Sequence, residues 1–463
     1  MGFLKSFFRE IKYYPSAIVG LLIILFLIVL SIYAVIAIPY SKAIVLWRGS
    51  SDIWYRNPKN APPAWVNYFR TKKLPETIDL DSRQEGVVER TEKPLSNGKQ
   101  IELTYTFDYQ ADEFPDDLVL YFFPTYQEKQ PFVTGEWYTP DGRKIRLGNF
   151  AINQGYTFRF TQDKDLARRL KRVLKRELPA EVGLFVDPAS LPEDPEAQVE
   201  NKDLRPLKGK YTVHLTITTF EKNDDVDAEL LVYGKVYGIA GTDHLRRDLK
   251  VGLLWGAPVA MAFGLISALV IGISTMVIAA IGVWYGGIVD DLIQRLTEIN
   301  MVLPFLPILI MVGIFISRSL WTIMLVTIAL SIFGSGIKSY RAMFLQLRAS
   351  PYIEAAQAYG ASNARIIFLY LIPRILPMLI PGFISAIPSF VFLEASLAVL
   401  GIGDPVLPTW GKIIQDAQAN SALYKGYYYW ILEPSALLMV TGLGFALLGF
   451  ALDRIFNPRL RQE

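Results

Sequence analysis

The residue types that most often carry out catalysis or bind metals are scarce in this chain of 463 residues. It contains no cysteine, so disulfides, thiol catalysis, iron–sulfur clusters and cysteine-ligated zinc are excluded. Its two histidines, His214 and His244, are too few for a histidine-rich metal site, and a Ser-His-Asp arrangement would have to use one of them. We expect His214, within KYTVHLTITTF, to be an ordinary strand residue.

Phosphate-binding and hydrolase patterns are missing as well. Four Gly-Lys pairs occur, but none is followed by the Ser or Thr of a phosphate-cradling loop. Neither G-x-S-x-G nor H-E-x-x-H is present. Any transport must therefore draw its energy from a gradient or from another subunit. Ion-coupled carriers usually place several acids or histidines in the membrane, whereas Glu394 is the only acid within a predicted apolar helix.

Charge is distributed unevenly along the chain. Hydrophobic residues make up 52% of it and charged residues 20%, below the roughly 25% of an ordinary soluble domain. Residues 41–240 hold 29 Lys and Arg and 31 Asp and Glu, whereas the other 263 positions hold 18 and 13. The sequence therefore predicts a membrane protein that contains a water-soluble block. Its net charge of +3 gives no indication of nucleic-acid binding.

Long stretches without charged residues predict the membrane spans, because charged side chains are expensive in hydrocarbon. One span needs about 20 apolar residues, so six spanning helices are predicted, the second of them unusually long. They are residues 16–38, 251–289, 299–317, 319–337, 375–393 and 434–452. The first stretch is too long for the apolar region of a signal peptide and no A-x-A site follows it, so we expect an anchor.

The basic residues next to these stretches predict the orientation, because Lys and Arg are concentrated in cytoplasmic loops. Those that we place inside are Lys5, Arg9, Lys12, Arg295, Lys338, Arg341, Arg348, Arg365, Arg374, Arg454, Arg459 and Arg461. We expect a multi-pass protein of the cell (plasma) membrane, with both termini in the cytoplasm and residues 41–240 outside.

The second span carries small residues at a regular interval. Ala260, Gly264, Ala268 and Gly272 recur every four residues. Such a ridge lets another helix approach closely. The sequence leaves open whether that helix belongs to this chain or to another one.

The block at 41–240 is predicted to be mainly β. Strand-like stretches rich in β-branched and aromatic residues lie at 101–109, 117–123, 132–138, 143–150, 155–161, 210–220 and 228–238. Asp141-Gly142 predicts a hairpin turn. We expect an antiparallel β-sandwich with one packed helix at 163–178.

That predicted helix has two different faces. Its buried stripe is Leu166, Leu170, Val173 and Leu174. Its other face carries Lys164, Arg168, Arg169, Lys171, Arg172, Lys175 and Arg176. This face is either merely solvated or a docking surface for an acidic partner or lipid headgroups. The candidate docking patch is Arg168, Arg169, Arg172 and Arg176.

Aromatic residues gather at the start of the same block. They are Trp47, Trp54, Tyr55, Trp65, Tyr68 and Phe69. They could stack on a sugar, form an aromatic belt at the membrane interface, or belong to the core.

A further helix is predicted between the fourth and fifth spans, within SPYIEAAQAYGASNARIIFLYLIPRILP at 350–377. Ser350 and Pro351 suit its first positions, and Gly360 can end it in the left-handed conformation. Ala355, Ala356 and Ala358 make it thin enough to fit a groove. From the residues alone, a mere connection between spans is the favoured interpretation.

The same segment resembles the EAA loop of binding-protein-dependent ABC importer permeases, through Glu354-Ala355-Ala356, Gly360 and Pro373. The chain looks most like the dipeptide, oligopeptide and nickel permeases. The matching stretches, in order, are GTDHLRRD (241–248), WYGGIVDDLIQRLTE (284–298), the EAA segment, EASLAVLGIGDPVLPTWGKII (394–414) and NPRLR (457–461). The family usually has Gly at Arg246, His at Tyr370 and Asn at Arg374, and a short outer loop in place of the block.

The resemblance implies a fold, partners and site residues. It implies a polytopic α-helical fold of the type I ABC importer kind, into which the extracytoplasmic β-rich domain is inserted. Glu354, Ala355, Ala356, Gly360 and Pro373 would couple the chain to two separate ATPase subunits, which hold the ATP and Mg. A second permease, often a different chain, would complete the pore, and an external binding protein would deliver the substrate. The outer-face motifs supply Gly241, Thr242, Asp243, Asp248, Glu394, Gly401, Trp410 and Gly411.

The predicted domains are residues 1–40, 41–240 and 241–463. The leading hypothesis for the function is an importer permease for peptides or similar oligomers, without an ATPase site of its own. Oligosaccharides are the alternative cargo. A membrane-anchored enzyme or glycan-binding module is an alternative of another class, and a self-contained carrier is a third.

Overall fold

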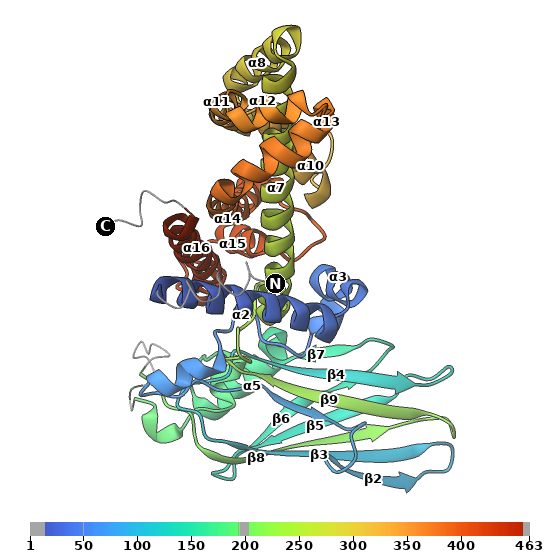
Figure 1. Cartoon of the computed structure of the whole chain (residues 1–463). Helices are drawn as coiled ribbons and strands as arrows, with labels where there is room; N and C mark the ends of the chain where they lie inside the picture. The colour runs from blue at the N-terminus through green and yellow to red at the C-terminus, as the bar shows by residue number, and fades with distance from the viewer. Residues whose placement is uncertain (1–13, 50, 193, 195–202, 457–463) are drawn as a thin grey trace. The chain divides into compact units, whose positions relative to one another are not determined.

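The computed structural model describes residues 14–49, 51–192, 194 and 203–456. The predicted basic residues Lys5, Arg9, Lys12, Arg459 and Arg461, and the 457–461 motif, lie outside this range. The chain separates into two compact units (Figure 1). The helical unit contains the described residues up to Arg48 and from Leu249 onward, and the β unit runs from Gly49 to Asp248.

The unit boundaries differ by eight residues at each side from the predicted block at 41–240. Helix α3 (Tyr40–Arg48) belongs to the helical unit, where Ala43 and Trp47 are buried. A Cβ on Gly252 would lie 2.8 Å from the Trp47 ring, so the two helices that carry them are in close contact. Residues 241–248 belong to the β unit, because their hydrogen bonds go to residues 57–61.

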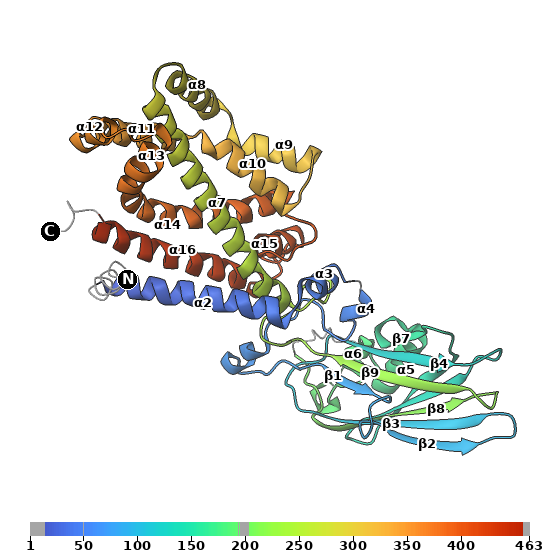
Figure 2. The same cartoon turned by 45° about the vertical axis from the view of Figure 1, so that its right-hand side comes forward.

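The remaining helices of the helical unit follow in chain order (Figure 2). They are α2 (Pro15–Ala37), α7 (Leu249–Tyr285), α8 (Gly287–Val302), α9 (Phe305–Phe315), α10 (Leu320–Ile332), α11 (Ser335–Arg348), α12 (Pro351–Ala358), α13 (Asn363–Arg365), η4 (Ile366–Leu371), α14 (Ile372–Leu397), η5 (Ala398–Ile402), α15 (Trp410–Ala419) and α16 (Tyr429–Phe456). One continuous helix of 37 residues, α7, covers most of the long charge-free stretch at 251–289, as predicted.

Several of these helices are long and apolar enough to cross a membrane. In the described part of the chain four qualify alone, namely α2, α7, the continuous run Asn363–Ile402 and α16. The pairs α8–α9 and α10–α11 qualify only when each bent pair is taken as one span, which gives up to six. They bend by 76° and 44°, at Pro304 and Gly334, residues that commonly interrupt helices. The chain is thus a multi-pass membrane protein.

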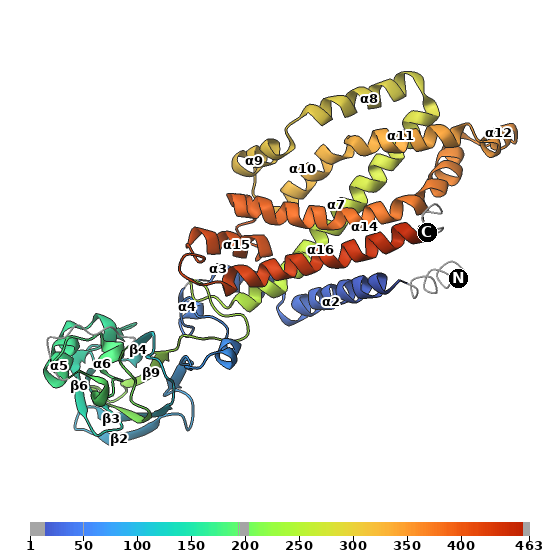
Figure 3. The same cartoon turned by 90° about the vertical axis from the view of Figure 1, so that its left-hand side faces the viewer.

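The small-residue ridge of α7 packs inside this chain. A Cβ on Gly264 would lie 2.7 Å from Val391 of α14, and one on Gly272 would lie 2.5 Å from Phe383. Another glycine contact joins α2 to α16, where a Cβ on Gly20 would lie 2.7 Å from the Gly444 oxygen. Figure 3 shows α2, α16 and α14 running side by side. The predicted ridge therefore contacts α14, and needs no second chain.

The β unit contains two antiparallel sheets. One has the order β1-β9-β4-β7, the other β2-β3-β8-β5-β6. The strands are β1 (Ile78–Asp81), β2 (Glu89–Pro94), β3 (Lys99–Tyr109), β4 (Asp117–Thr125), β5 (Phe132–Tyr138), β6 (Lys144–Ala151), β7 (Thr157–Arg159), β8 (Gly209–Thr218) and β9 (Asp225–Tyr233). The helical segments are α4 (Ser51–Trp54), η1 (Ala64–Phe69), η2 (Phe160–Gln162), α5 (Lys164–Leu174), α6 (Ala180–Gly183) and η3 (Pro188–Ser190).

The two sheets share one hydrophobic core, so the predicted sandwich is confirmed. Alternate residues of β3 point inward, and Ile101, Leu103 and Tyr105 are fully buried. The Tyr105 hydroxyl donates to the Ala228 carbonyl of β9, 2.8 Å away, and so links the sheets. The predicted turn at Asp141-Gly142 joins β5 to β6, with Gly142 at φ +85°.

Helix α5 is shorter than predicted. Asp163 caps its start by accepting from the Leu166 amide, and Lys175, at φ 54°, ends it. Because the helix stops there, Arg176 leaves the predicted basic face and is 8% exposed. Val173 was also wrongly placed in the buried stripe, since it is 48% exposed.

Candidate functional site

The segment that resembles the EAA loop forms the short helix α12. Pro351 is its first residue, and the Ser350 side chain makes no capping hydrogen bond although its position is that of an N-cap. At the other end Gly360 has φ +77°, as predicted. The Gly360 amide donates to Gln357 at 2.9 Å and the Ala361 amide to Ala356 at 3.0 Å, which satisfies the last carbonyls.

One face of α12 is exposed, and the helix is followed by Tyr359, which is 92% exposed. Glu354, Ala355 and Gly360 lie on the surface, whereas Ala356 is 8% exposed. A Cβ on Gly360 would have no atom within 4 Å. Pro373, near the start of α14, is also exposed. Of the predicted coupling residues, Ala356 therefore supports the helix from beneath, and the others are accessible to another protein.

The buried face of α12 is fixed by apolar packing. Ile353 is 1% exposed and belongs to a cluster with Ile293 of α8, Phe344 of α11 and Ile366 of η4. The cluster also takes in Val283 near the end of α7. Because protein interiors are close-packed, a displacement of α12 would be felt by these helices together.

Polar contacts join the same helices. Arg341 of α11 donates two hydrogen bonds from Nε to the Asp290 carboxylate of α8, at 2.9 and 3.0 Å, and Nη2 adds a third contact at 2.5 Å. Arg348, two residues before Ser350, donates to the Val283 carbonyl at 2.7 Å. The sequence analysis did not predict that Arg341 and Asp290 join α11 to α8, although Asp290 lies within the quoted 284–298 stretch.

The motif residues of 394–414 come together at one end of the helical unit. Glu394 is buried, and Asp404 accepts from the Leu320 amide at 2.9 Å. The Trp410 indole donates to the Leu253 carbonyl at 2.9 Å, against the α7 backbone. Two glycines of the motif meet different requirements: Gly401 has the left-handed φ of +89°, and Gly411 is closely packed, since a Cβ there would lie 2.6 Å from Ala395. The residues of this motif therefore hold α15 against α7 and α14, and the loop at Asp404 against the start of α10.

The 241–248 motif lies in the β unit and fastens its two ends together. The Thr242 hydroxyl donates to the Pro58 carbonyl at 2.8 Å and accepts from the Ala61 amide at 3.1 Å. Asp243, fully buried, pairs with Arg247 at 2.5 Å. Gly241 has φ +73°, and Asp248 forms an antiparallel bridge with Thr242. The predicted outer-face set is thus divided between the two units.

The candidate docking patch on α5 is smaller than predicted. Arg176 is buried and donates to the carbonyls of Pro192 and Asp194. Arg169 donates to the carbonyls of Arg146 and Leu147 on β6, an edge strand whose unpaired groups it covers. Arg168 and Arg172 are exposed, and Arg168 pairs with Asp165 at 3.1 Å. Only two of the four predicted arginines therefore lie free of the sandwich.

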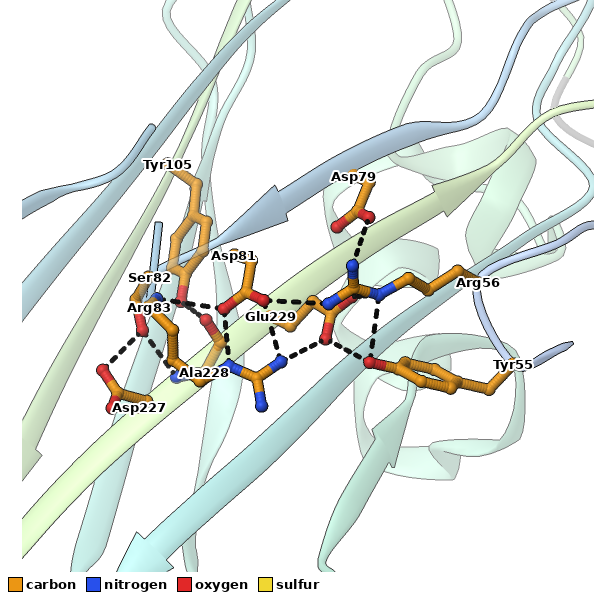
Figure 4. Close-up of polar contacts among 10 residues, drawn as sticks. All are labelled: Tyr55, Arg56, Asp79, Asp81, Ser82, Arg83, Tyr105, Asp227, Ala228 and Glu229. Atoms are coloured by element: carbon orange, nitrogen blue, oxygen red, sulfur yellow. Dashed lines mark hydrogen bonds and ion pairs between the residues drawn. The ribbon is translucent and has the colours of Figure 1, made fainter. Parts of the chain in front are cut away.

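A charged network on the β1-β9-β4 sheet escaped sequence reasoning (Figure 4). Glu229, fully buried, contacts Arg56 at 2.7 Å, Arg83 at 3.0 Å and the Tyr55 hydroxyl at 2.8 Å. Burial raises the pKa of Glu229 above its ordinary value. Asp81 also accepts from both arginines. The network holds the segment that enters the β unit against the sheet.

The chemistry of the described residues is that of packing and protein contact. No group of three or more potential metal ligands occurs among them. His214 lies on β8, with Nδ1 3.1 Å from the Thr104 hydroxyl across the strand, which confirms an ordinary strand residue.

Residues 252–462 match the family described as the binding-protein-dependent transport system inner membrane component. A probable peptide ABC transporter permease of Sinorhizobium fredii is 30% identical over 225 residues, which cover 48% of this chain and 75% of that protein. This chain belongs to that family. It is a membrane-spanning permease subunit of an ABC importer, and not an enzyme.

Two other relatives come from Bacillus subtilis. Its oligopeptide transport system permease protein OppC is 28% identical over 226 residues, covering 48% of this chain and 72% of the relative. Its dipeptide transport system permease protein DppC is 26% identical over 225 residues, covering 48% and 69%. Since the family match begins at residue 252, the β unit of this permease lies outside it.

Proposed function

We propose that this permease imports peptides across the cell membrane, as one half of a pore completed by a second permease chain. The names of its relatives support peptides as cargo, because they transport peptides, oligopeptides and dipeptides. Oligosaccharides are the rival cargo. Reconstituted complexes should hydrolyse ATP faster with a peptide-loaded binding protein, whereas stimulation by oligosaccharides alone would favour the rival.

The helix α12 is proposed to dock into an ATPase subunit, and two such subunits would bind the ATP and Mg. The observation that carries this is its exposed face of Glu354, Ala355 and Gly360 above the buried Ile353 and Ala356. The exposed surface of α12 and its C-cap combines the small Ala355 and Gly360, the Glu354 carboxylate and the ring of Tyr359, which is 92% exposed, and a groove of another protein can receive them together. Closure of the ATPases would then move α12 together with the cluster beneath it.

Replacing Glu354 by Lys tests this docking. The variant should insert in the membrane normally and lose substrate-stimulated ATP hydrolysis, because its charge at the contact is reversed. Gln346→Lys is the control, since Gln346 is exposed on the neighbouring α11 and receives the same lysine outside α12, with a charge change of one unit where Glu354→Lys has two. Normal stimulation in Glu354→Lys, or an equal loss in the control, would count against α12 as the coupling helix.

We further propose that α12 faces the cytoplasm and the β unit the outside, where an external binding protein delivers cargo. The distribution of Lys and Arg supports this orientation. Because the chain has no cysteine, one can be introduced at Asn223 in the β unit or at Gln357 in α12, both exposed. An impermeant maleimide should label only the former in intact cells. Labelling of Gln357→Cys alone would reverse the orientation.

The β unit is proposed to receive the binding protein at the pore mouth. The exposed Arg168 and Arg172 are the part of the predicted docking patch that remains accessible for this contact. A solvated, purely stabilising domain is the alternative, and the ion pair between Arg168 and Asp165 favours it. Exposed charges act mainly on association rates at low salt. Unchanged low-salt capture of the binding protein by a variant with both arginines reversed would support the stabilising role.

A further inference from the structure

Four large apolar side chains are exposed together on the β unit, and one of them lies nine residues before the last residue of that unit, Asp248. Three come from η1, where Trp65, Tyr68 and Phe69 are 45%, 88% and 83% exposed. Ile239 joins them and is 70% exposed. We call these four residues the aromatic patch. Isolated exposed apolar residues are normal, but a group of large ones marks a contact surface.

The aromatic patch is held in a fixed shape. The Trp65 indole donates to the Ile239 carbonyl at 2.9 Å, and the Ala64 amide donates to the Gly238 carbonyl at 2.9 Å. Trp65 and Phe69 meet edge to face, with ring centroids 6.2 Å apart. These bonds join two segments far apart in the sequence, so the patch is built into the fold and is not a frayed loop.

The covalent connection keeps the patch close to the membrane helices. Ile239 lies three residues before Thr242, which spans at most about 11 Å. Thr242 forms a bridge with Asp248, and Asp248 directly precedes α7. Adding about 5 Å for the bridge and 4 Å for the last peptide brings Ile239 within about 20 Å of the first residue of α7, however the two units are oriented.

The start of α7 lies where a membrane interface is expected. The Trp255 indole donates to the carbonyl of Ile38, one residue beyond the end of α2, at 3.0 Å. The end of α2 is therefore level with Trp255, in the second turn of α7, and tryptophan is typical of the interface. Leu249 is six residues before Trp255, or about 9 Å along the helix. The aromatic patch can thus reach the headgroup layer.

The surroundings of the patch suit lipid. Trp and Tyr are amphipathic and favour the headgroup region, and basic residues next to them favour anionic lipid. Arg70, Lys72 and Lys73 directly follow η1 and are exposed, although Arg70 is paired with Glu113 at 3.0 Å. We propose that the aromatic patch rests in the lipid headgroup layer and holds the β unit against the membrane surface.

Spin labelling of the full chain in lipid nanodiscs tests this contact, and the absence of cysteine makes single-site labelling direct. A nitroxide at Tyr68→Cys should be accessible to oxygen, which partitions into lipid, and shielded from a water-soluble nickel chelate. The control is Asn97→Cys, exposed in the β2–β3 hairpin, which should show the reverse. Adding Phe69→Ser and Ile239→Ser should reduce the lipid-facing population of the Tyr68→Cys label by about tenfold or more.

Three results would overturn the proposal. Full access of the nickel chelate at Tyr68→Cys would leave the patch in water. Shielding from both reagents would indicate that a protein, such as a second chain or a binding protein, covers it. An unchanged profile after Phe69→Ser and Ile239→Ser would show that the label inserts through its own hydrophobicity and not through the patch.

Discussion

Substitution of Gly360 separates backbone strain from side-chain bulk at the end of α12. Its φ of +77° lies in the left-handed region, which side chains other than glycine and asparagine rarely adopt. A Cβ there would nevertheless have open space, with no atom within 4 Å. Ala, Asn and Val at this position should therefore differ by their backbone preference and not by their volume.

The expected magnitude follows from that geometry. A left-handed conformation costs an ordinary residue about 1–2 kcal/mol, which lowers the population of the native helix end by roughly 5- to 30-fold. Asparagine tolerates the conformation and should lose only a few-fold, whereas a β-branched valine should lose the most. The matched control is Gly382→Ala in α14, where a Cβ also has open space but φ is not positive. It should be neutral or slightly stabilising.

Hydrogen exchange and ATP hydrolysis provide independent measurements. The amides of residues 360 and 361 donate to the carbonyls of Gln357 and Ala356. Their exchange should be slowest in the Gly360→Asn variant, faster in Gly360→Ala and fastest in Gly360→Val. If α12 is the coupling helix, substrate-stimulated ATP hydrolysis should fall least in the Asn variant and most in the Val variant. Equal loss of ATP hydrolysis in Asn and Val, with exchange unchanged, would refute the strain argument and indicate close approach of another protein to Gly360.

Two further predictions concern charges. Asp290→Asn and Arg341→Gln should each lower the unfolding free energy of the helical unit by about 1–3 kcal/mol, as measured by thermal unfolding. The double variant should lose less than the sum of the two single losses, because each single variant leaves one charge without its partner. Losses that add up would show that the ion pair, 2.5 Å between Arg341 and Asp290, contributes nothing. Burial raises the pKa of Glu229, so its protonated form favours folding and its contribution declines as pH rises through that pKa. The unfolding free energy of wild type minus that of Glu229→Gln, followed by hydrogen exchange of β9, should therefore fall as pH rises above about 4.5. For Asp81→Asn the corresponding difference should instead rise with pH, and it should do so mainly below about pH 4, because burial opposes the ionisation of Asp81 but the Arg83 bonds outweigh burial and lower its pKa. A difference for Glu229→Gln that rises with pH as well would show that the arginines outweigh its burial.

The sequence predicted the strands that are rich in β-branched and aromatic residues, and it missed two that are short or polar. In β3 and β8, inward and outward residues follow one another along the whole strand, so their pattern is legible without a structure. Strand β2, ERTEKP, is an edge strand with almost no buried residue, and β1 has only four residues. Four residues are too few for a periodic signal, and β2 contains no large apolar side chain, so both strands form because a neighbouring strand offers its hydrogen-bonding groups.

Helix breaks were harder to predict than helices. Charge-free stretches located the apolar segments, but did not show that Pro304 and Gly334 divide two of them into bent pairs. The end of α5 at Lys175 was missed for a related reason, since no glycine or asparagine marks it. Once the helix ends there, a helical projection no longer describes Arg176, and its place in the predicted patch is lost.

The charged network around Glu229 could not have been derived from spacing. Its members Arg56, Asp81 and Arg83 come from the segment before β1, from β1 itself and from the turn after it, and only the fold brings them to β9. By contrast, the helix end at Gly360 was predictable, because the residue type required by the conformation is itself a local signal. Local backbone requirements can be read from sequence, and partners distant along the chain cannot.

Arg246 shows how the two kinds of information combine. The sequence has arginine where the resembling permeases usually have glycine, and the structure gives this residue φ +65°, a conformation that costs arginine about 1–2 kcal/mol. Its guanidinium lies 4.2 Å from the Tyr233 ring centre and donates to the Asn57 carbonyl, contacts of a size that offsets this cost. Tyr233 and Asn57 both belong to the β unit that replaces the usual short loop. The inserted domain therefore supplies the partners that allow a non-glycine residue at the closing turn of its own fold.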